Sequence, residues 1–383
     1  MRGRKSARGS LVASAAPAAV ALTLVTSCSL LTSLDGLSGG PAALGDDAGP
    51  TDANGPIDAS GPTDGPTDSS TGPDGPRTKP RVWRQLAVTG PPPLHSARMV
   101  FDEARGKVVL VGGGSPMQTS HETWEWDGTA WSSPTITTKP TATLGPGLAY
   151  DSTRHVTMLF AGANGTSDPL EWDGGQSWRS SGSSATSPDM RYSTTMVYDR
   201  ARNVLVVFGG IRQGGTSSIN NGETWEWSAA GGFVNRMPAV SPPARRANVL
   251  VYDTARSRVV AFAGTAKAAG QNDVWEWDGT SWLQRTPPLS PPARRGPCGA
   301  YDSARQVTVI FGGRPQNTNS SSLDDTWEWD GTTWKQGPPG PPGRSSCAMT
   351  YDSKHDQIVM YGGSPARMNA AASTAVAETW VYE

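Results

Sequence analysis

The amino-acid sequence predicts an all-β protein, a six-bladed β-propeller built from four-stranded antiparallel blades. The motif Trp-Glu-Trp-Asp-Gly, with a third Trp three residues after the Gly, is complete at 124–131, 275–282 and 327–334. An aromatic-Asp pair precedes each copy, and six such pairs recur with a period near 50 residues. The 383 residues include 45 Gly and 32 Pro, and 36% are hydrophobic, which suits a turn-rich β protein and argues against helical classes. The six pairs are Phe101-Asp102, Tyr150-Asp151, Tyr198-Asp199, Tyr252-Asp253, Tyr301-Asp302 and Tyr351-Asp352.

One repeat predicts the four strands of one blade. In the fourth repeat, alternating and apolar segments are separated by polar turns, and Asp278-Gly279 supplies the positive φ of a tight hairpin. A single four-stranded sheet cannot bury both faces, so neighbouring units must stack, and a closed ring leaves no long exposed edge. The expected strands are 247–252, 258–263, 274–277 and 281–285, with a turn at 253–256.

The two ends of the array predict how the ring closes. The sixth repeat stops at Trp380-Val381-Tyr382-Glu383, before any fourth strand. Near the N-terminus, Val82-Trp83-Arg84-Gln85 resembles the fourth strand at 281–284. We therefore expect the N-terminal strand to complete the last blade. All 15 Trp then fall on repeat positions, where they pack blade against blade.

These features resemble kelch repeats, in which a diglycine closes the second strand and a Trp follows a dozen or more residues later. The resemblance covers about 81–383, and it implies a propeller of the galactose-oxidase type. The copper ligands of galactose oxidase have no counterparts that can be assigned residue by residue, and the sialidase box does not match. Diglycines stand at 112–113, 209–210, 312–313 and 362–363, with near matches at 161–162 and 263–264.

The first 28 residues read as an export signal. Arg2, Arg4, Lys5 and Arg8 form a positive region before an apolar stretch that is too short for a stable membrane span. The end of this segment, Leu-Val-Thr-Ser-Cys at 24–28, resembles a bacterial lipoprotein signal. That resemblance implies lipidation at Cys28 and a membrane anchor there. The alternative is ordinary signal cleavage with an incidental Cys.

Residues 29–79 predict a disordered tether. Between residues 46 and 74, seven Asp lie among Gly, Pro, Thr and Ser, and no aromatic residue is present in 29–79 to start a core. A calcium site is the weaker interpretation, because the Asp residues lack the dense spacing of such sites. The expected organisation is thus a signal at 1–28, a tether at 29–79 and a propeller at 80–383.

Charge argues against nucleic acid as a partner. The formal net charge is −1, and outside the leader no strongly basic region remains to neutralise a phosphate backbone. We expect a monomer.

We expect binding on the face that carries the loops between second and third strands. These loops differ in length and content from repeat to repeat, whereas the turns on the opposite face have repeated sequences. An Arg recurs on the expected binding face seven residues before the aromatic of the pair, with Leu94 and Thr143 breaking the series and Arg246 and Arg295 doubling it. A partial basic ring at the channel mouth would suit carboxylate or sulfate groups. The alternative is that each Arg braces the connection between blades. The candidate ligand-binding residues are Arg191, Arg245, Arg294 and Arg344.

Catalytic and metal-binding patterns are not found in the sequence. The four His, at 95, 121, 155 and 355, lack the spacing of metal ligands, so we expect no metal and no cofactor. Cys298 and Cys347 lie three and four residues before Tyr301 and Tyr351. Because a shift of one residue turns a strand side chain to the other face, we expect two buried free thiols.

The combined features predict a non-catalytic binding module, exported as an outer-membrane or cell-surface lipoprotein. Its expected ligand is an envelope protein or a glycan. The alternative is a carbohydrate-active enzyme of the galactose-oxidase-like propeller type, with a site assembled from loop residues such as His121, Asp324, Asp325 and Arg314.

Overall fold

A computed structural model describes residues 80–115, 118–141, 143–162, 168–182, 184–214, 217–267, 269–316, 321–365 and 375–383. They lie within one compact unit, Gly75–Glu383. The predicted signal at 1–28, with Cys28, and the tether at 29–79 fall outside the described residues. No helix among the described residues is long and apolar enough to cross a membrane.

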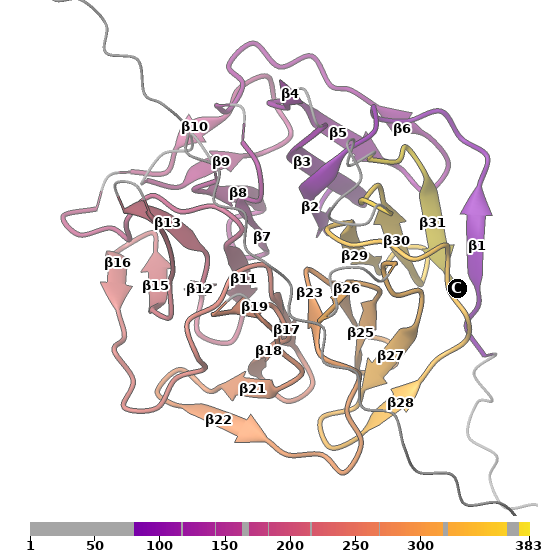
Figure 1. Cartoon of the computed structure of the whole chain (residues 1–383). Coiled ribbons are helices and arrows are strands. Elements are labelled where there is room, and N and C mark those ends of the chain that lie inside the picture. The colour runs from indigo at the N-terminus through magenta and orange to yellow at the C-terminus, as the bar shows by residue number, and fades with distance from the viewer. Residues whose placement is uncertain are drawn as a thin grey trace, which may run out of the picture. The chain divides into compact units, whose positions relative to one another are not determined.

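The fold is a six-bladed β-propeller of four-stranded antiparallel sheets, which confirms the predicted class (Figure 1). Short accessory strands extend the loops between second and third strands, and one, β23, lies just before the first strand of the fifth blade. Blades one to three, from first to fourth strand, are β2 (His95–Asp102), β3 (Lys107–Ser115), β5 (Thr123–Trp126), β6 (Trp131–Ser132); β7 (Gly147–Asp151), β8 (Val156–Phe160), β9 (Leu170–Trp172), β10 (Arg179–Ser180); β11 (Thr195–Asp199), β12 (Val204–Phe208), β15 (Thr224–Ser228), β16 (Gly232–Asn235). Blades four to six are β17 (Val249–Asp253), β18 (Arg258–Phe262), β21 (Val274–Trp277), β22 (Trp282–Arg285); β24 (Cys298–Asp302), β25 (Val307–Phe311), β27 (Thr326–Trp329), β28 (Trp334–Gln336); β29 (Ala348–Asp352), β30 (Gln357–Tyr361), β31 (Thr379–Tyr382), β1 (Trp83–Leu86). The accessory strands are β4 (Gln118–Thr119), β13 (Ile211–Gly214), β14 (Ser217–Asn220), β19 (Thr265–Ala266), β20 (Ala269–Gly270), β23 (Arg294–Arg295) and β26 (Arg314–Pro315).

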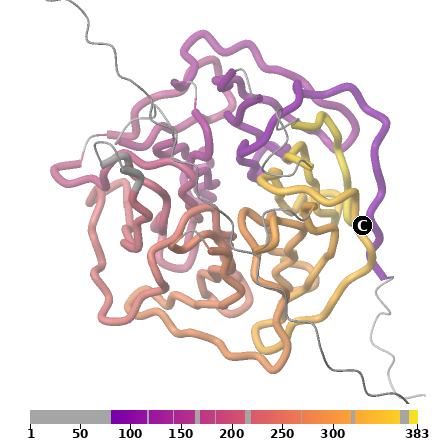
Figure 2. The backbone as a smooth tube through the Cα atoms, viewed as in Figure 1, coloured from indigo at the N-terminus to yellow at the C-terminus, as the bar shows by residue number. Residues whose placement is uncertain are grey.

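The ring closes as the sequence predicts. Strand β1 pairs antiparallel with β31, and Trp83 lies opposite Tyr382 in the register. The N-terminal part of the propeller therefore runs beside its C-terminal end at the rim of the ring (Figures 1 and 2). The Trp83 ring stacks on Tyr382, with 5.0 Å between ring centroids.

Fourth-strand tryptophans join each blade to the one before it. In four blades the indole N–H donates to a Thr that begins the third strand of the preceding blade, and Trp83 makes this bond just as the internal repeats do. In the third blade Phe233 replaces the Trp, and the facing residue of the second blade is Pro169, which has no hydroxyl. The four bonds are Trp83 to Thr326, Trp131 to Thr379, Trp178 to Thr123 and Trp282 to Thr224, at 2.8–3.1 Å.

The expectation of free thiols at Cys298 and Cys347 is wrong. The two residues form a disulfide, with 5.6 Å between their Cα atoms, and it joins the first strands of blades five and six. Neighbouring blades are separate sheets that stack. The front face of the first strand in one blade therefore packs on the back face of the first strand in the next blade. Facing positions in adjacent blades must therefore differ by one residue, which is the offset of this pair. The same offset brings Thr195 of the third blade to Asn248 of the fourth, where the hydroxyl donates to the amide oxygen at 3.4 Å.

Candidate functional site

The turn face, which carries the turns between first and second strands, is occupied by ion pairs. In blades one to five, the Asp of the aromatic-Asp pair accepts from an Arg three residues later, and the same Arg reaches the Glu of the third strand. In blade five, Arg305 lies 2.7 Å from both Asp302 and Glu328. Three of these arginines also lie over an aromatic ring of the following blade: Arg105 over Trp172, Arg154 over Trp227 and Arg305 over Tyr382. These ion pairs neutralise the guanidinium groups of the turn face, although Nη2 of Arg105, Arg202, Arg256 and Arg305 is buried without a hydrogen-bond partner among the described residues.

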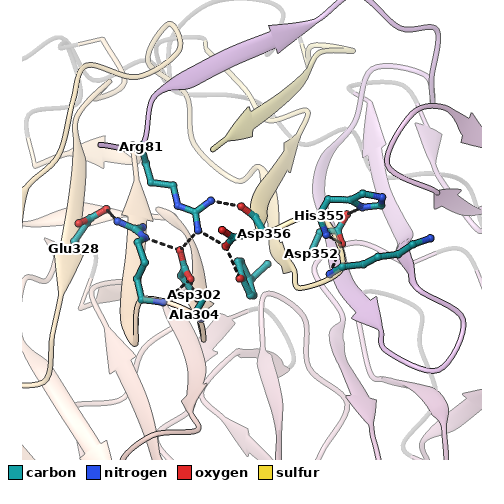
Figure 3. Close-up of polar contacts among 10 residues, drawn as sticks. Arg81, Asp302, Ala304, Glu328, Asp352, His355 and Asp356 are labelled. Carbon is teal, nitrogen blue, oxygen red and sulfur yellow. Dashed lines mark hydrogen bonds and ion pairs between the residues drawn. The ribbon is translucent and has the colours of Figure 1, made fainter. Parts of the chain in front are cut away.

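The sixth blade breaks this pattern and is completed from outside. His355 stands in place of the Arg and bonds Asp352 at 2.7 Å, while Val381 stands in place of the Glu. The buried side chain of Arg81, from the segment before β1, reaches Asp302 at 3.2 Å and also contacts Asp356 (Figure 3). Asp302 thus holds two guanidinium groups, and the N-terminal segment supplies a cation that the sixth repeat lacks.

On the opposite loop face, the four predicted ligand-binding arginines are buried. Arg294 donates to the carbonyl oxygens of Pro292 and Gly312 and forms a bidentate pair with Asp325 at 2.7 and 2.8 Å. The indole N–H of Trp327 donates to the same carboxylate. Burial alone would raise the pKa of Asp325, but the hydrogen bond from Arg294 holds it below its ordinary value.

This geometry matches the bracing alternative, and ligand binding by these four residues stays a prediction. Each side chain is at most 1% exposed and is paired with an acidic residue two positions before the first Trp of the third strand. An acidic residue at this position recurs in the sequence. Its pairing with the Arg becomes visible only in the structure, because the second-to-third loop separates the two residues in the chain. The pairs are Arg191 with Glu223, Arg245 with Asp273, Arg294 with Asp325 and Arg344 with Glu378.

The central channel contains two cavities separated by an apolar collar. The collar consists of the residues two positions before the aromatic of each pair, and these six residues line both cavities. On the loop side lies a chamber of about 80 Å³, which we call the inner chamber. On the turn side a wider cavity of about 540 Å³ opens past Glu103 and Arg200. The collar residues are Met99, Leu148, Met196, Leu250, Gly299 and Met349.

The sequence does not predict the turn-side cavity, because it depends on ring closure. The one sequence signal is that the residue after the Asp of each pair varies within an otherwise repeated turn. Those facing the cavity are Glu103, Arg200, Thr254, Ser303 and Ser353.

At the loop-side channel mouth, cations gather without carboxylate partners. Arg295 of β23 lies opposite Arg314 of β26 in the register. Arg314 donates to the hydroxyls of Ser345 and Ser364, and no ion pair to Arg295 or Arg314 occurs within the described ranges. Burial and the charge of Arg314 lower the pKa of His95, so this imidazole is neutral at pH 7. We call Arg295, Arg314 and His95 the mouth cluster.

The loop residues considered for an enzyme are not brought together. His121 lies 3.0 Å from Glu122 in the first blade, whereas Asp325 is engaged by Arg294 in the fifth. Asp324 is exposed, and of these residues Arg314 alone belongs to the mouth cluster. Among the described residues, no group of three or more His, Cys, Asp or Glu is placed to hold a metal ion.

The strand order, the diglycines and the repeated ion pairs define a kelch-type β-propeller. The chain belongs to the kelch-repeat family described as the KLHDC2/KLHL20/DRC7 Kelch-repeats domain, whose model matches residues 152–363, more than half of the chain. Among solved structures it is similar to the one titled "Structure of YjhT", with 14% sequence identity, a TM-score of 0.58, and coverage of 76% of this chain and 95% of that chain. At this identity the likeness shows the fold alone. Comparison with curated protein sequences finds no match.

Proposed function

We propose that the protein is a non-catalytic binding module, tethered at the bacterial cell envelope through Cys28, which binds an acidic glycan or an acidic protein segment on its loop face. The lipoprotein-like sequence at 24–28 and the Asp-rich segment at 29–79 support the tether. The family supports a binding role, because kelch propellers are generally non-catalytic.

The observation that carries the proposed binding face is the contrast in charge between the two ends of the channel. At the turn end, each repeated Arg is neutralised by carboxylates of its own blade. At the loop end, Arg295 and Arg314 lie across from one another and meet no carboxylate within the described ranges. Guanidinium groups bind carboxylate and sulfate in bidentate geometry, so such a mouth favours an acidic ligand.

An array of neutral and acidic glycans, probed with the full-length protein, tests this proposal. We expect binding to acidic glycans that is lost in the Arg295→Gln/Arg314→Gln variant. The matched control is Arg258→Gln, which removes a turn-side Arg that donates only to the carbonyl of Ser257. Binding that survives the double variant would contradict the proposed face.

The same double variant separates a glycan from a protein ligand. If the array is blank, capture of acidic proteins from solubilised envelope by wild type, but not by the double variant, supports an acidic protein segment instead. If the array is blank and the wild type and the double variant capture acidic proteins equally well, the loop-face proposal is contradicted. Turnover of envelope glycans would contradict the non-catalytic role.

A further inference from the structure

Arg98 is a half-buried cation that faces the channel. It lies on β2, one residue before the collar, and lines the inner chamber. Its Nε donates to the carbonyl oxygen of Pro146 at 3.1 Å, and its Nη2 donates to that of Thr194 at 3.0 Å. A single side chain from the first blade therefore reaches the second and third blades.

This guanidinium differs from the four bracing arginines in having no counter-charge. Each bracing Arg meets an Asp or Glu, whereas the hydrogen-bond partners of Arg98 among the described residues are neutral carbonyl groups. No Asp or Glu is among the residues that line the inner chamber. Burial lowers the pKa of Arg98 to about 10, so the group keeps its charge at neutral pH.

A half-buried charge without a counter-charge is costly, and an anion in the chamber would relieve that cost. Two of the five guanidinium N–H groups are used by the carbonyls, and Nη1 donates to no group in the part of the chain that the structure describes. Thr195 and Asn248 also line the chamber, but their donors are used by the carbonyl oxygens of Phe208 and Val249, so the free donors are those of Arg98. A volume of about 80 Å³ exceeds the roughly 10–15 Å³ that one water requires, so a small ion fits.

We propose that the inner chamber binds one small monovalent anion, such as chloride or formate, on Arg98. The anion neutralises a cation that ties three blades together, so its binding stabilises the ring. The apolar collar lies between the chamber and the turn-side cavity, since its residues line both. This site is separate from the mouth cluster and does not depend on the proposed acidic ligand.

The first test is thermal unfolding of the full-length protein at constant ionic strength, with sodium gluconate replaced stepwise by sodium chloride or sodium formate. Gluconate, a much larger anion, serves as the reference. We expect a saturable rise of several degrees in Tm with either small anion, as for any ligand that binds only the folded state. In Arg98→Met the rise is lost, while in the surface control Arg258→Met it is retained.

Comparing the two anions identifies the class of ion. A stronger effect of chloride indicates an inorganic ion, and a stronger effect of formate indicates a carboxylate. A rise that persists in Arg98→Met would overturn the site.

Bromide-soaked crystals of the wild type test the site without any variant. We expect an anomalous peak within hydrogen-bond distance of the Arg98 guanidinium. An empty chamber at saturating bromide would overturn the proposal, even if Arg98→Met fails to fold.

Discussion

The sixth blade and the other five reach the same fold by different means. Five blades are each one continuous segment whose Asp, Arg and Glu pair internally. The sixth takes its outer strand from the N-terminal end and has His355 and Val381 where the others have Arg and Glu. What it lacks is supplied from elsewhere, by Arg81, by Trp83 and by the disulfide to the fifth blade. Ring closure therefore depends on contacts that the repeat itself does not encode.

Deleting residues 81–86 should have the largest effect, because it removes the outer strand of the sixth blade together with Arg81 and Trp83. It exposes the edge of β31, removes Trp83 from its contacts with Tyr382 and Phe311, and leaves Asp356 without Arg81. Loss of a fully buried Trp costs about 3–5 kcal/mol, and this deletion removes half-buried Trp83 together with a whole strand, so we expect a loss of at least that size in the free energy of unfolding. Denaturant titration measures it.

The control is a deletion of equal length in the tether, residues 65–70. It should leave the unfolding midpoint unchanged. An unchanged midpoint on deletion of 81–86 would refute noncovalent closure by β1.

A second comparison sets the bracing Arg of the fifth blade against that of the sixth. Arg294 binds Asp325 through two hydrogen bonds, and the carboxylate side chain is 17% exposed. Arg344 makes a single bond to Glu378, which is 31% exposed. Breaking a buried pair costs about 3–5 kcal/mol, so Arg294→Gln should cost that amount and Arg344→Gln distinctly less. Equal losses in denaturant titrations would show that the two braces are equivalent.

The same pair predicts a dependence on pH. The folded pKa of Asp325 is depressed, so its contribution to stability is present above the unfolded value of about 3.9 and is lost as pH falls below it. The difference between wild type and Arg294→Gln should therefore be constant near neutrality and should narrow as pH falls from about 5. A difference that widens with acid would contradict the ion pair.

The sequence was sufficient to predict elements whose signal is local. The strands of the fourth blade begin and end within two residues of the predicted bounds, because apolar alternation and the Asp-Gly turn set them. Closure was predictable since Trp83 lies in a copy of the fourth-strand pattern.

Features that depend on how separate blades pack against one another were missed or misjudged. The carboxylate partners of the bracing arginines, the two cavities and the unpaired charge of Arg98 arise only when the ring is closed. The disulfide was misjudged because strand parity was applied as if Cys298 and Cys347 shared one sheet, whereas they lie on facing sheets.

Removing the disulfide should cost less than breaking the brace of the fifth blade. Losing a native disulfide typically costs about 2–4 kcal/mol, and we expect this from Cys298→Ala/Cys347→Ala. The wild type unfolded without reductant should show no alkylation at either Cys by mass spectrometry, and reductant should expose both. Alkylation of both residues before reduction would contradict the bond.

The smallest effect tests how one blade recognises the next. The indole N–H of Trp334 is buried without a hydrogen-bond partner, because Val274 stands where the preceding blade elsewhere presents a Thr. Thr224 is the matched position, and its hydroxyl accepts from Trp282 at 2.8 Å. Val274→Thr should supply the missing acceptor and raise the free energy of unfolding by about 1 kcal/mol, whereas Thr224→Val should lower it by about 1–3 kcal/mol.

These two substitutions exchange nearly equal volumes in opposite directions at equivalent positions, so packing changes little and the hydrogen bond dominates the difference. Denaturant titrations of both variants should therefore move in opposite directions. If Val274→Thr destabilises the protein as much as Thr224→Val does, burial of the hydroxyl outweighs its bond to the indole. In that case the Trp–Thr hydrogen bonds would be a consequence of the repeated sequence and would not stabilise the ring.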